Sequence, residues 1–295
     1  MMHLVVIEFA PLEDELGDVL DKAMLRAGLS GDALARRARV APEKIRDAID
    51  YRNELSADEI RRLAATLSLN ETGLLSLAQN RYPLPPIAGL PLCLYPLRAP
   101  HGIGVANAYI IADCSSRSGL LFDTGASHAA LRRVWPKRIQ KLDALFITHA
   151  QTEHIGGLAA LLDELGPLPV FCPEDSPPLP GAAHPVAAGE AARLRFGPFE
   201  VRVLKTPGHA EAHNCYHITV PKLPHSAGLL ISGDLLFAGS AGRGFFCRHR
   251  MEESLRRLFD ELPDNTIIAP GHGPLTTLEN ERRFNPFAPR RASLT

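Results

Sequence analysis

The segment Phe146-Ile147-Thr148-His149-Ala150-Gln151-Thr152-Glu153-His154-Ile155-Gly156-Gly157 places metal-binding side chains directly after an apolar strand. Three later segments repeat this arrangement, each with a Gly-containing turn followed by His or Asp. Such a turn holds side chains rigidly at the edge of a sheet, and glycine lets the backbone come close to a bound ion. A single His is most often only hydrogen-bonded or exposed, but four such segments together predict a metal site. The three later segments are Thr206–His209, Ile231–Asp234 and Ala269–His272.

The residue types in these segments indicate which metals the site would hold. Imidazole and carboxylate ligands suit zinc, iron and manganese. None of the four segments contains Cys, which argues against a structural zinc site built from thiolates. We therefore expect one or two divalent ions, zinc or iron, with manganese as a third candidate.

The four segments, in this order, resemble the metallo-β-lactamase superfamily and, within it, the glyoxalase II-like hydrolases. The resemblance covers roughly residues 90–290. It implies an α/β fold, the αβ/βα sandwich of that superfamily, and a metal-dependent hydrolase that acts on a thioester or related ester through a metal-bound hydroxide. It says much less about the substrate, because one fold hosts many chemistries. Other matching segments are Phe122–Gly125, Gly233–Phe237 with Gly242-Arg243, Pro270–Thr277 and Glu281–Phe287.

The resemblance also implies a ligand set, residue by residue. The first metal site would take His149, Gln151, His209 and Asp234. The second would take Glu153, His154 and His272, with Asp234 as the carboxylate that bridges the two sites.

Two of these positions depart from the family's His-x-His-x-Asp-His pattern. Gln151 stands where the family has its second His, and Glu153 stands where it has Asp. Removing a group that merely hydrogen-bonds to a ligand typically costs about 10–100-fold in metal affinity, so replacing a ligating imidazole by an amide oxygen should cost no less. Glu153 keeps the carboxylate but adds a methylene. Both changes raise the share of oxygen ligands and shift the preference weakly from zinc toward iron or manganese.

Two other functions remain open at this stage. The persulfide dioxygenases of the same superfamily hold a single iron at positions equivalent to His149, His209 and Asp234, a ligand set that Gln151 would not disturb. A metabolite-sensing regulator that binds DNA is the third alternative. Retention of His154 and His272 favours the hydrolase.

The resemblance gives further residues a role around the metals. Asp234 is the catalytic carboxylate, since it would bridge both ions. Asp123 would orient the ligands, or else cap the turn at Gly125. Arg243 would contact an anionic small-molecule substrate, or else serve as a structural ion-pair partner. His213 and His217 follow His209 closely, but we expect neither to be a ligand.

Composition sets the context for these assignments. The chain has 295 residues, 45% of them hydrophobic, and a net charge of −1, so it can bury a large core and is not a basic protein. Its five Cys residues are scattered, and the odd count suits a reducing cytoplasm. No run of about 18 apolar residues occurs, and the first residues lack the basic start of a signal peptide. We expect a cytoplasmic protein that does not enter a membrane.

The pattern of the chain changes near residue 82. Apolar residues recur at helical spacing from Leu16 to Gln79, with Ser30, Ser56 and Asn70 as candidate helix caps. The Pro-rich stretch 82–86 then predicts a stiff linker. Beyond it we expect alternating strands and helices. The predicted strands and helices include 109–111, 201–204, 157–165 and 251–262, with a surface loop at 172–185. We predict a helical domain at residues 1–82 and a metallo-β-lactamase-fold domain at residues 83–295.

The helical domain resembles the helix-turn-helix domain of the lambda repressor and Cro, on residues 32–46 and 59–67. In that family the second helix enters the DNA major groove. Arg39 departs from the pattern, because the turn usually carries Gly. Residues 1–82 hold 11 Lys and Arg against 14 Asp and Glu, a net charge of −3, whereas DNA affinity depends on basic side chains. We therefore favour a module for homo-oligomer assembly or for covering the active site over a DNA-binding module.

Overall fold

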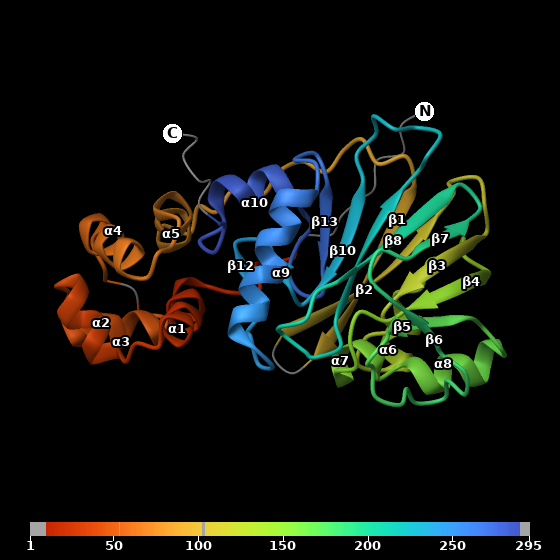
Figure 1. Ribbon diagram of the computed structural model, residues 1–295, viewed down its shortest axis with the longest axis horizontal. Coiled ribbons are helices and arrows are strands. Elements are labelled where there is room, and N and C mark those ends of the chain that lie inside the picture. The colour runs from red at the N-terminus through yellow and green to blue at the C-terminus, as the bar shows by residue number, and fades with distance from the viewer. Residues whose placement is uncertain (1–9, 53, 102–103, 290–295) are drawn as a thin grey trace.

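The computed structural model describes residues 10–52, 54–101 and 104–289 (Figure 1). Five short helices come first in the chain, as the helical spacing predicts. Their N-caps include the three predicted residues, since the side chains of Ser30, Ser56 and Asn70 each accept a hydrogen bond from a backbone N–H of the first turn. The helices are α1 (Leu16–Ala27), α2 (Gly31–Ala38), α3 (Pro42–Ile49), α4 (Ala57–Thr66) and α5 (Glu71–Ala78).

Two six-stranded sheets form the centre of the remaining part of the molecule. The first has the order β1-β2-β3-β4-β5-β6 and the second the order β14-β13-β10-β9-β8-β7. The first sheet consists of β1 (Cys93–His101), β2 (Gly104–Ala112), β3 (Ser118–Phe122), β4 (Lys141–Phe146), β5 (Val170–Pro173) and β6 (Val186–Ala188). The second consists of β7 (Arg193–Phe196), β8 (Phe199–Lys205), β9 (Asn214–Thr219), β10 (Leu229–Gly233), β13 (Ile267–Pro270) and β14 (Thr276–Thr277), and β11 (Leu236–Phe237) pairs with β12 (Ser240–Ala241).

Helices cover the outer face of each sheet, which gives the αβ/βα sandwich. The first sheet carries α6 (His128–Arg133) and α8 (Leu158–Leu165), and the second carries α9 (Arg248–Glu261) and α10 (Leu278–Phe284) (Figure 1). The short helix α7 (Thr152–Ile155) lies between β4 and α8 in the chain. The expected α/β fold class is confirmed, and the strands and helices predicted at 109–111, 201–204, 157–165 and 251–262 lie in β2, β8, α8 and α9.

Alternation along the central strands explains the two cores. In β4, Phe146 faces the core between the sheets, whereas its neighbour Leu145 faces the helices outside. In β10, Ile231 faces the core between the sheets, and Leu230 faces α9 and α10. Where a strand is buried on both faces, successive positions are apolar, as Ala144, Leu145 and Phe146 are at the end of β4.

The N-terminal helices pack directly against the second sheet's helices. Buried residues of α1 to α5 belong to the same hydrophobic cluster as Leu255 of α9 and Leu278 of α10. At the α5–α10 contact the backbones come so close that a Cβ on Gly73 would lie 1.9 Å from the Phe284 carbonyl oxygen. The chain between α5 and β1 is also anchored, because the Tyr82 hydroxyl donates to the buried Glu281 carboxylate at 2.9 Å. The domain boundary at residues 82/83 stays a prediction.

One disulfide is present, which the cysteine count did not lead us to expect. Cys93 and Cys114 are bonded across the start of β1 and the residues after β2. Antiparallel pairing of these strands sets Cys93 opposite Ala112, so residues 21 apart in sequence become neighbours. Spacing along the chain could not reveal this pairing. Cys172, Cys215 and Cys247 are free.

No helix among the described residues combines the length and the apolar character that a membrane span requires.

Candidate metal centre

The predicted ligands follow the carboxyl ends of strands that lie side by side. β3 and β4 are parallel neighbours in the first sheet, and β10 and β13 are parallel neighbours in the second. Asp123 follows β3, and His149 follows β4. Asp234 and His272 follow β10 and β13 in the same way. Parallel strands bring their carboxyl ends to one edge, so the turns after them meet there.

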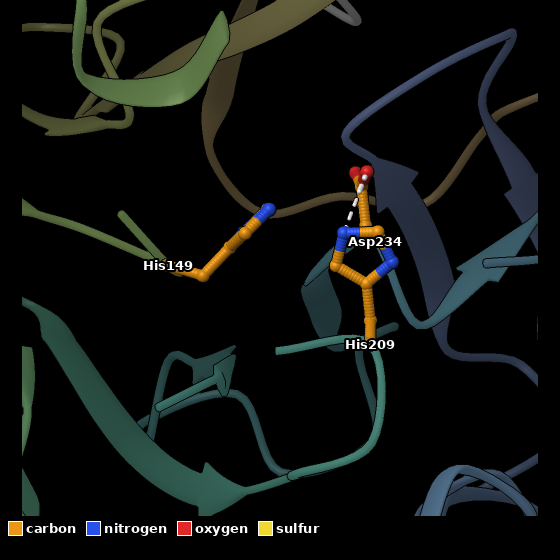
Figure 2. Close-up of side chains that lie close together, drawn as sticks. All are labelled: His149, His209 and Asp234. Atoms are coloured by element: carbon orange, nitrogen blue, oxygen red, sulfur yellow. Dashed lines mark ion pairs between the residues drawn. The ribbon is translucent and has the colours of Figure 1, made fainter. Parts of the chain in front are cut away.

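Two groups of side chains result, and they share one carboxylate. The ligand atoms of His149, His209 and Asp234 all lie within 4.8 Å of one another, with His149 pointing toward the other two side chains from the opposite side (Figure 2). A second group of Glu153, His154 and His272 meets the same limit.

Asp234 lies between the two groups. Its Oδ2 is 3.6 Å from Nε2 of His209 and 3.4 Å from Nε2 of His272, and its Oδ1 is 3.4 Å from Nε2 of His154. The structure thus brings all seven predicted ligand positions to one place, since Gln151 also reaches into the first group.

Close backbone approach explains the glycine that precedes His272. A Cβ on Gly271 would lie 2.2 Å from Oδ1 of Asp234 and 2.9 Å from the His154 ring. Any other residue would displace the carboxylate that both groups share. Glycine at position 271 is therefore required by the centre itself.

Asp123 fixes the orientation of His154. Its Oδ2 accepts a hydrogen bond from Nδ1 of His154 at 3.0 Å and another from the Thr148 hydroxyl at 2.8 Å. Its Oδ1 accepts from the Thr148 backbone N–H at 2.8 Å. With Nδ1 of His154 donating to Asp123, Nε2 of the same ring faces Asp234.

The other three imidazoles are oriented by the same principle. The Thr148 hydroxyl gives its proton to Asp123, so its oxygen accepts from Nδ1 of His149 at 3.0 Å. Nδ1 of His209 donates to the Arg243 carbonyl, and Nδ1 of His272 donates to the Val105 carbonyl, each at 3.0 Å. A protein acceptor on one ring nitrogen leaves the other nitrogen as an electron-pair donor.

All four Nε2 atoms therefore face one space, whose acceptors can be satisfied by a metal ion or by protonation of the rings. Asp234 contributes a carboxylate there, and both its Oδ1 and Nε2 of His154 are buried without a hydrogen-bond partner. Buried acceptors that face one another at 3.4 Å repel unless a cation lies between them. The donor set of imidazole, carboxylate and amide oxygen fits one or two divalent transition-metal ions.

Gln151 belongs to the first group through its side-chain oxygen. Oε1 is 3.3 Å from Nε2 of His149 and 3.0 Å from Nε2 of His209. Because both nitrogens carry lone pairs in the tautomers set by Thr148 and Arg243, the amide oxygen adds a third electron-pair donor. The oxygen lies beside both imidazoles of the first group, and its role as a ligand stays a prediction.

The pKa values of the buried groups reflect the same demand for positive charge. Burial lowers the pKa of His154, but the Asp234 and Asp123 carboxylates outweigh burial and raise it to about 10. Burial would raise the pKa of Asp234, yet the neighbouring His154 holds it well below its usual range. Burial lowers the pKa of both His149 and His209, which keeps these rings neutral. A proton or a metal ion satisfies the carboxylates, so the two compete for the centre.

His213 positions Asp234 and is not a ligand candidate. Its Nδ1 contacts the Thr206 hydroxyl at 2.8 Å, and its Nε2 accepts from the Asp234 backbone N–H at 3.2 Å. Thr148, Thr206 and His213 were not predicted as positioning residues. Their positions within or beside the ligand segments were the only signal in the sequence.

Sequence reasoning also missed two carboxylates that the N-terminal segment brings to the centre. Oε2 of Glu13 lies 3.7 Å from Nδ1 of His272, and burial raises the pKa of Glu13. Oδ2 of Asp21 in α1 pairs with Arg243 at 2.7 Å. The neighbouring Asp14 is buried and pairs with Lys22. No sequence motif marks the contacts of Glu13 and Asp21, whose partners lie more than two hundred positions away in the chain.

Comparison with known proteins agrees with this geometry. The family model described as metallo-beta-lactamase superfamily matches residues 101–272, more than half of the chain. The chain belongs to the metallo-β-lactamase superfamily. Residues 1–100, including all five N-terminal helices, lie outside the matched range.

Three similar proteins illustrate the range of this superfamily. The "Probable metallo-hydrolase YqgX" of Bacillus subtilis is 31% identical over 212 residues, which cover 64% of this chain and 95% of that protein. A hydroxyacylglutathione hydrolase of Cyanothece sp. is 34% identical over 166 residues, covering 56% of this chain and 62% of that enzyme. The crystal structure of TTHA1623 in a di-iron-bound form is 30% identical with a TM-score of 0.52, covering 65% of this chain and 99% of that one.

Proposed function

We propose that the chain is a metal-dependent hydrolase that cleaves a thioester or related ester of a small molecule. The single observation that carries this proposal is the placement of four imidazole rings around the Asp234 carboxylate. Hydrolase names among the similar proteins support it, one of them a hydrolase of hydroxyacylglutathione.

Each of the two groups of side chains would hold one metal ion. His149, Gln151 and His209 would hold the first ion, Glu153, His154 and His272 the second, and Asp234 would bridge them. A bound divalent ion supplies a coordinated water whose pKa falls from 15.7 to about 7, and polarises the carbonyl under attack. The similarity to a di-iron form and the oxygen-rich ligand set favour iron alongside zinc.

The chain's own residues keep the centre ready for that chemistry. Asp123 and Thr148 hold Nδ1 of His154 and His149, so Nε2 of each ring faces the centre. Because the pKa of His154 is raised to about 10, a metal ion at the second group has to displace a proton from this ring. Asp234, buried and held by His213, keeps its negative charge between the two groups. Arg243 would bind an anionic group on the substrate, in competition with Asp21.

A single-iron, oxygen-dependent enzyme is the alternative that the His149–His209–Asp234 group raises. The retained second group of Glu153, His154 and His272 favours the hydrolase, because a single-iron enzyme has no use for it. The expected homo-oligomer stays a prediction that light scattering of the purified protein would decide.

Hydrolysis under controlled metal loading tests the proposal. Full-length protein loaded with zinc or with iron is assayed for thiol release from a panel of acyl thioesters, with dissolved oxygen monitored throughout. We expect thiol release without oxygen uptake, and its loss in His154→Ala. His184→Ala, an exposed His in the loop after β5, serves as the matched control and should retain full activity. Oxygen uptake in step with turnover of a persulfide would instead establish the single-iron enzyme.

A further inference from the structure

A cavity of about 400 Å³ lies between the N-terminal helix α1 and helix α9 of the metallo-β-lactamase domain. Its apolar lining comes from both parts of the chain, with Leu25 on α1 and Met251 and Leu255 on α9. Phe245 and Phe287 add aromatic surface. Small-molecule sites typically measure about 300–1,000 Å³ and are lined mainly by apolar side chains, so this cavity suits a ligand with an apolar body.

The polar part of the lining is mostly basic. Four cations line the cavity, and Glu252 is the one carboxylate among the residues described there. Three of these cations already pair with carboxylates, namely Asp14, Glu252 and Asp21, so an anionic ligand has to displace one of them. Basic groups within an apolar lining fit an organic anion better than a cationic molecule. The four cations are Lys22, Arg26, Arg243 and Arg248.

Each cation is held by a contact across the two parts of the chain. Lys22 donates to the Ala241 carbonyl at 2.9 Å, and Arg248 donates to the Leu25 carbonyl. Arg26 pairs with Glu252 at 2.7 Å. Helix α1 is therefore fixed as a wall of the cavity.

The cavity and the metal centre share one loop. The Arg243 carbonyl accepts the hydrogen bond that orients His209, while the Arg243 guanidinium lines the cavity. Phe245, which also lines the cavity, has its ring centroid 5.3 Å from that of His209. Arg243 and Phe245 therefore connect the cavity to His209 of the first metal group.

Asp21 already occupies the position that a ligand's anionic group would take on Arg243. The pair is 2.7 Å long, and about a third of each side chain is exposed, 32% for Arg243 and 38% for Asp21. Ion pairs that exposed are weak, so displacing Asp21 would reduce a ligand's affinity by about fivefold at most. A carboxylate with bidentate geometry can replace it.

We propose that this cavity binds an organic anion with an apolar body, and that Asp21 is the internal counter-ion which the ligand displaces from Arg243. The occupant is the non-reacting end of the substrate, a statement that rests on the proposed hydrolase function. The N-terminal helix then determines specificity, since it supplies Leu25, Lys22 and the competing carboxylate.

Binding of octanoate to the metal-loaded full-length protein tests the cavity without any turnover. Octanoate should bind, whereas octylammonium should not, and 1-octanol should bind equally to all charge variants. Asp21→Asn should tighten octanoate binding by up to about fivefold. Arg243→Gln should weaken it about tenfold, and in that background Asp21→Asn should have no further effect.

Leu25 offers a matched pair for the apolar wall. Leu25→Asp and Leu223→Asp replace side chains of equal exposure, 52% each, but only Leu25 lines the cavity. The first change should abolish octanoate binding and the second should leave it unchanged. Equal binding of octanoate and octanol, or no response to Asp21→Asn, overturns the proposal.

A separate measurement tests whether the cavity holds the non-reacting end of the substrate. Competitive inhibition of thioester hydrolysis by octanoate supports this assignment, and octanoate binding without inhibition refutes it. If no thioester is hydrolysed while octanoate binds as described, the hydrolase proposal fails and the cavity stands. If hydrolysis occurs while octanoate does not bind, only the cavity proposal fails.

Discussion

At the scale of single residues, Gln151 is the departure that most affects metal binding. Its Oε1 lies 3.3 and 3.0 Å from Nε2 of His149 and His209, in the position of a first-group ligand. Since imidazole is the better ligand for zinc, Gln151→His should raise zinc affinity at the first group by about tenfold or more. Elemental analysis and competition with a chelator measure this, with Gln140→His, an exposed position, as control. Two tightly held zinc ions in both wild type and variant would disprove it.

Glu13 should matter for the second group alone. Its carboxylate lies 3.7 Å from Nδ1 of His272, where negative charge makes the imidazole a stronger donor. We expect Glu13→Gln to lower metal affinity at the second group by about tenfold, without changing the first. Metal titration followed by the spectrum of bound cobalt separates the groups. Glu43→Gln, exposed on α3, is the control, and an equal loss from both groups would contradict this role.

The candidate ligands could be named from the sequence because His209, Asp234 and His272 each follow a strand and a glycine-containing turn, and the first segment follows the strand before it; their role as ligands stays a prediction. Asp234 and His272 were each recognised from a segment of four residues, Ile231–Asp234 and Ala269–His272. Glu13 and Asp21 could not be found in this way, since their partners His272 and Arg243 are distant in the chain and only packing joins them. The tautomers were equally hidden, because they depend on which oxygen each Nδ1 meets in the folded protein.

At the scale of elements, helix ends were predictable and the docking of helices was not. The cap of α4 shows why, since Ser56 and Glu59 satisfy each other's backbone N–H groups three residues apart. The hydrogen bond from the Ser56 N–H, with help from Lys44, lowers the pKa of Glu59 to about 2. A carboxylate with a depressed folded-state pKa stabilises the fold above its unfolded pKa of 4.5, and this contribution is lost as the pH falls toward 2.

Unfolding of wild type and Glu59→Gln across this range tests the cap. The variant should be less stable at pH 7, and the difference should shrink between pH 4.5 and about 2, the interval set by the two pKa values. Chemical denaturation at each pH measures it. A difference that does not change with pH would exclude the ionised Glu59 as the cause.

Helices α2 and α3 lie in the segment that resembles a helix-turn-helix in sequence, but the charge of the N-terminal region does not suit DNA. Arg39 has a φ of 53°, so it adopts the left-handed conformation for which glycine is favoured in this turn. On and after α3, Lys44 pairs with Glu59, and Arg52 with Asp47 and Asp50. Residues 1–82 carry a net charge of −3, so we expect them to bind duplex DNA only weakly. Fluorescence anisotropy with labelled duplexes is the measurement, and sequence-selective submicromolar binding at physiological salt would favour the regulator.

At the scale of the whole molecule, the N-terminal helices and the metal domain should unfold as one unit, because a single hydrophobic cluster spans both. Gly73→Ala tests this, since the added Cβ would lie 1.9 Å from the Phe284 carbonyl and force α5 away from α10. Such overpacking typically costs about 1–3 kcal/mol. Gly31→Ala is the matched control, because its Cβ would meet only Met24 at 3.9 Å. Calorimetry should show one unfolding transition, and its midpoint temperature should fall in Gly73→Ala but not in Gly31→Ala. Two transitions, with that of the metal domain unchanged, would mean that the helices fold independently. In that case α1 would be no fixed wall of the cavity.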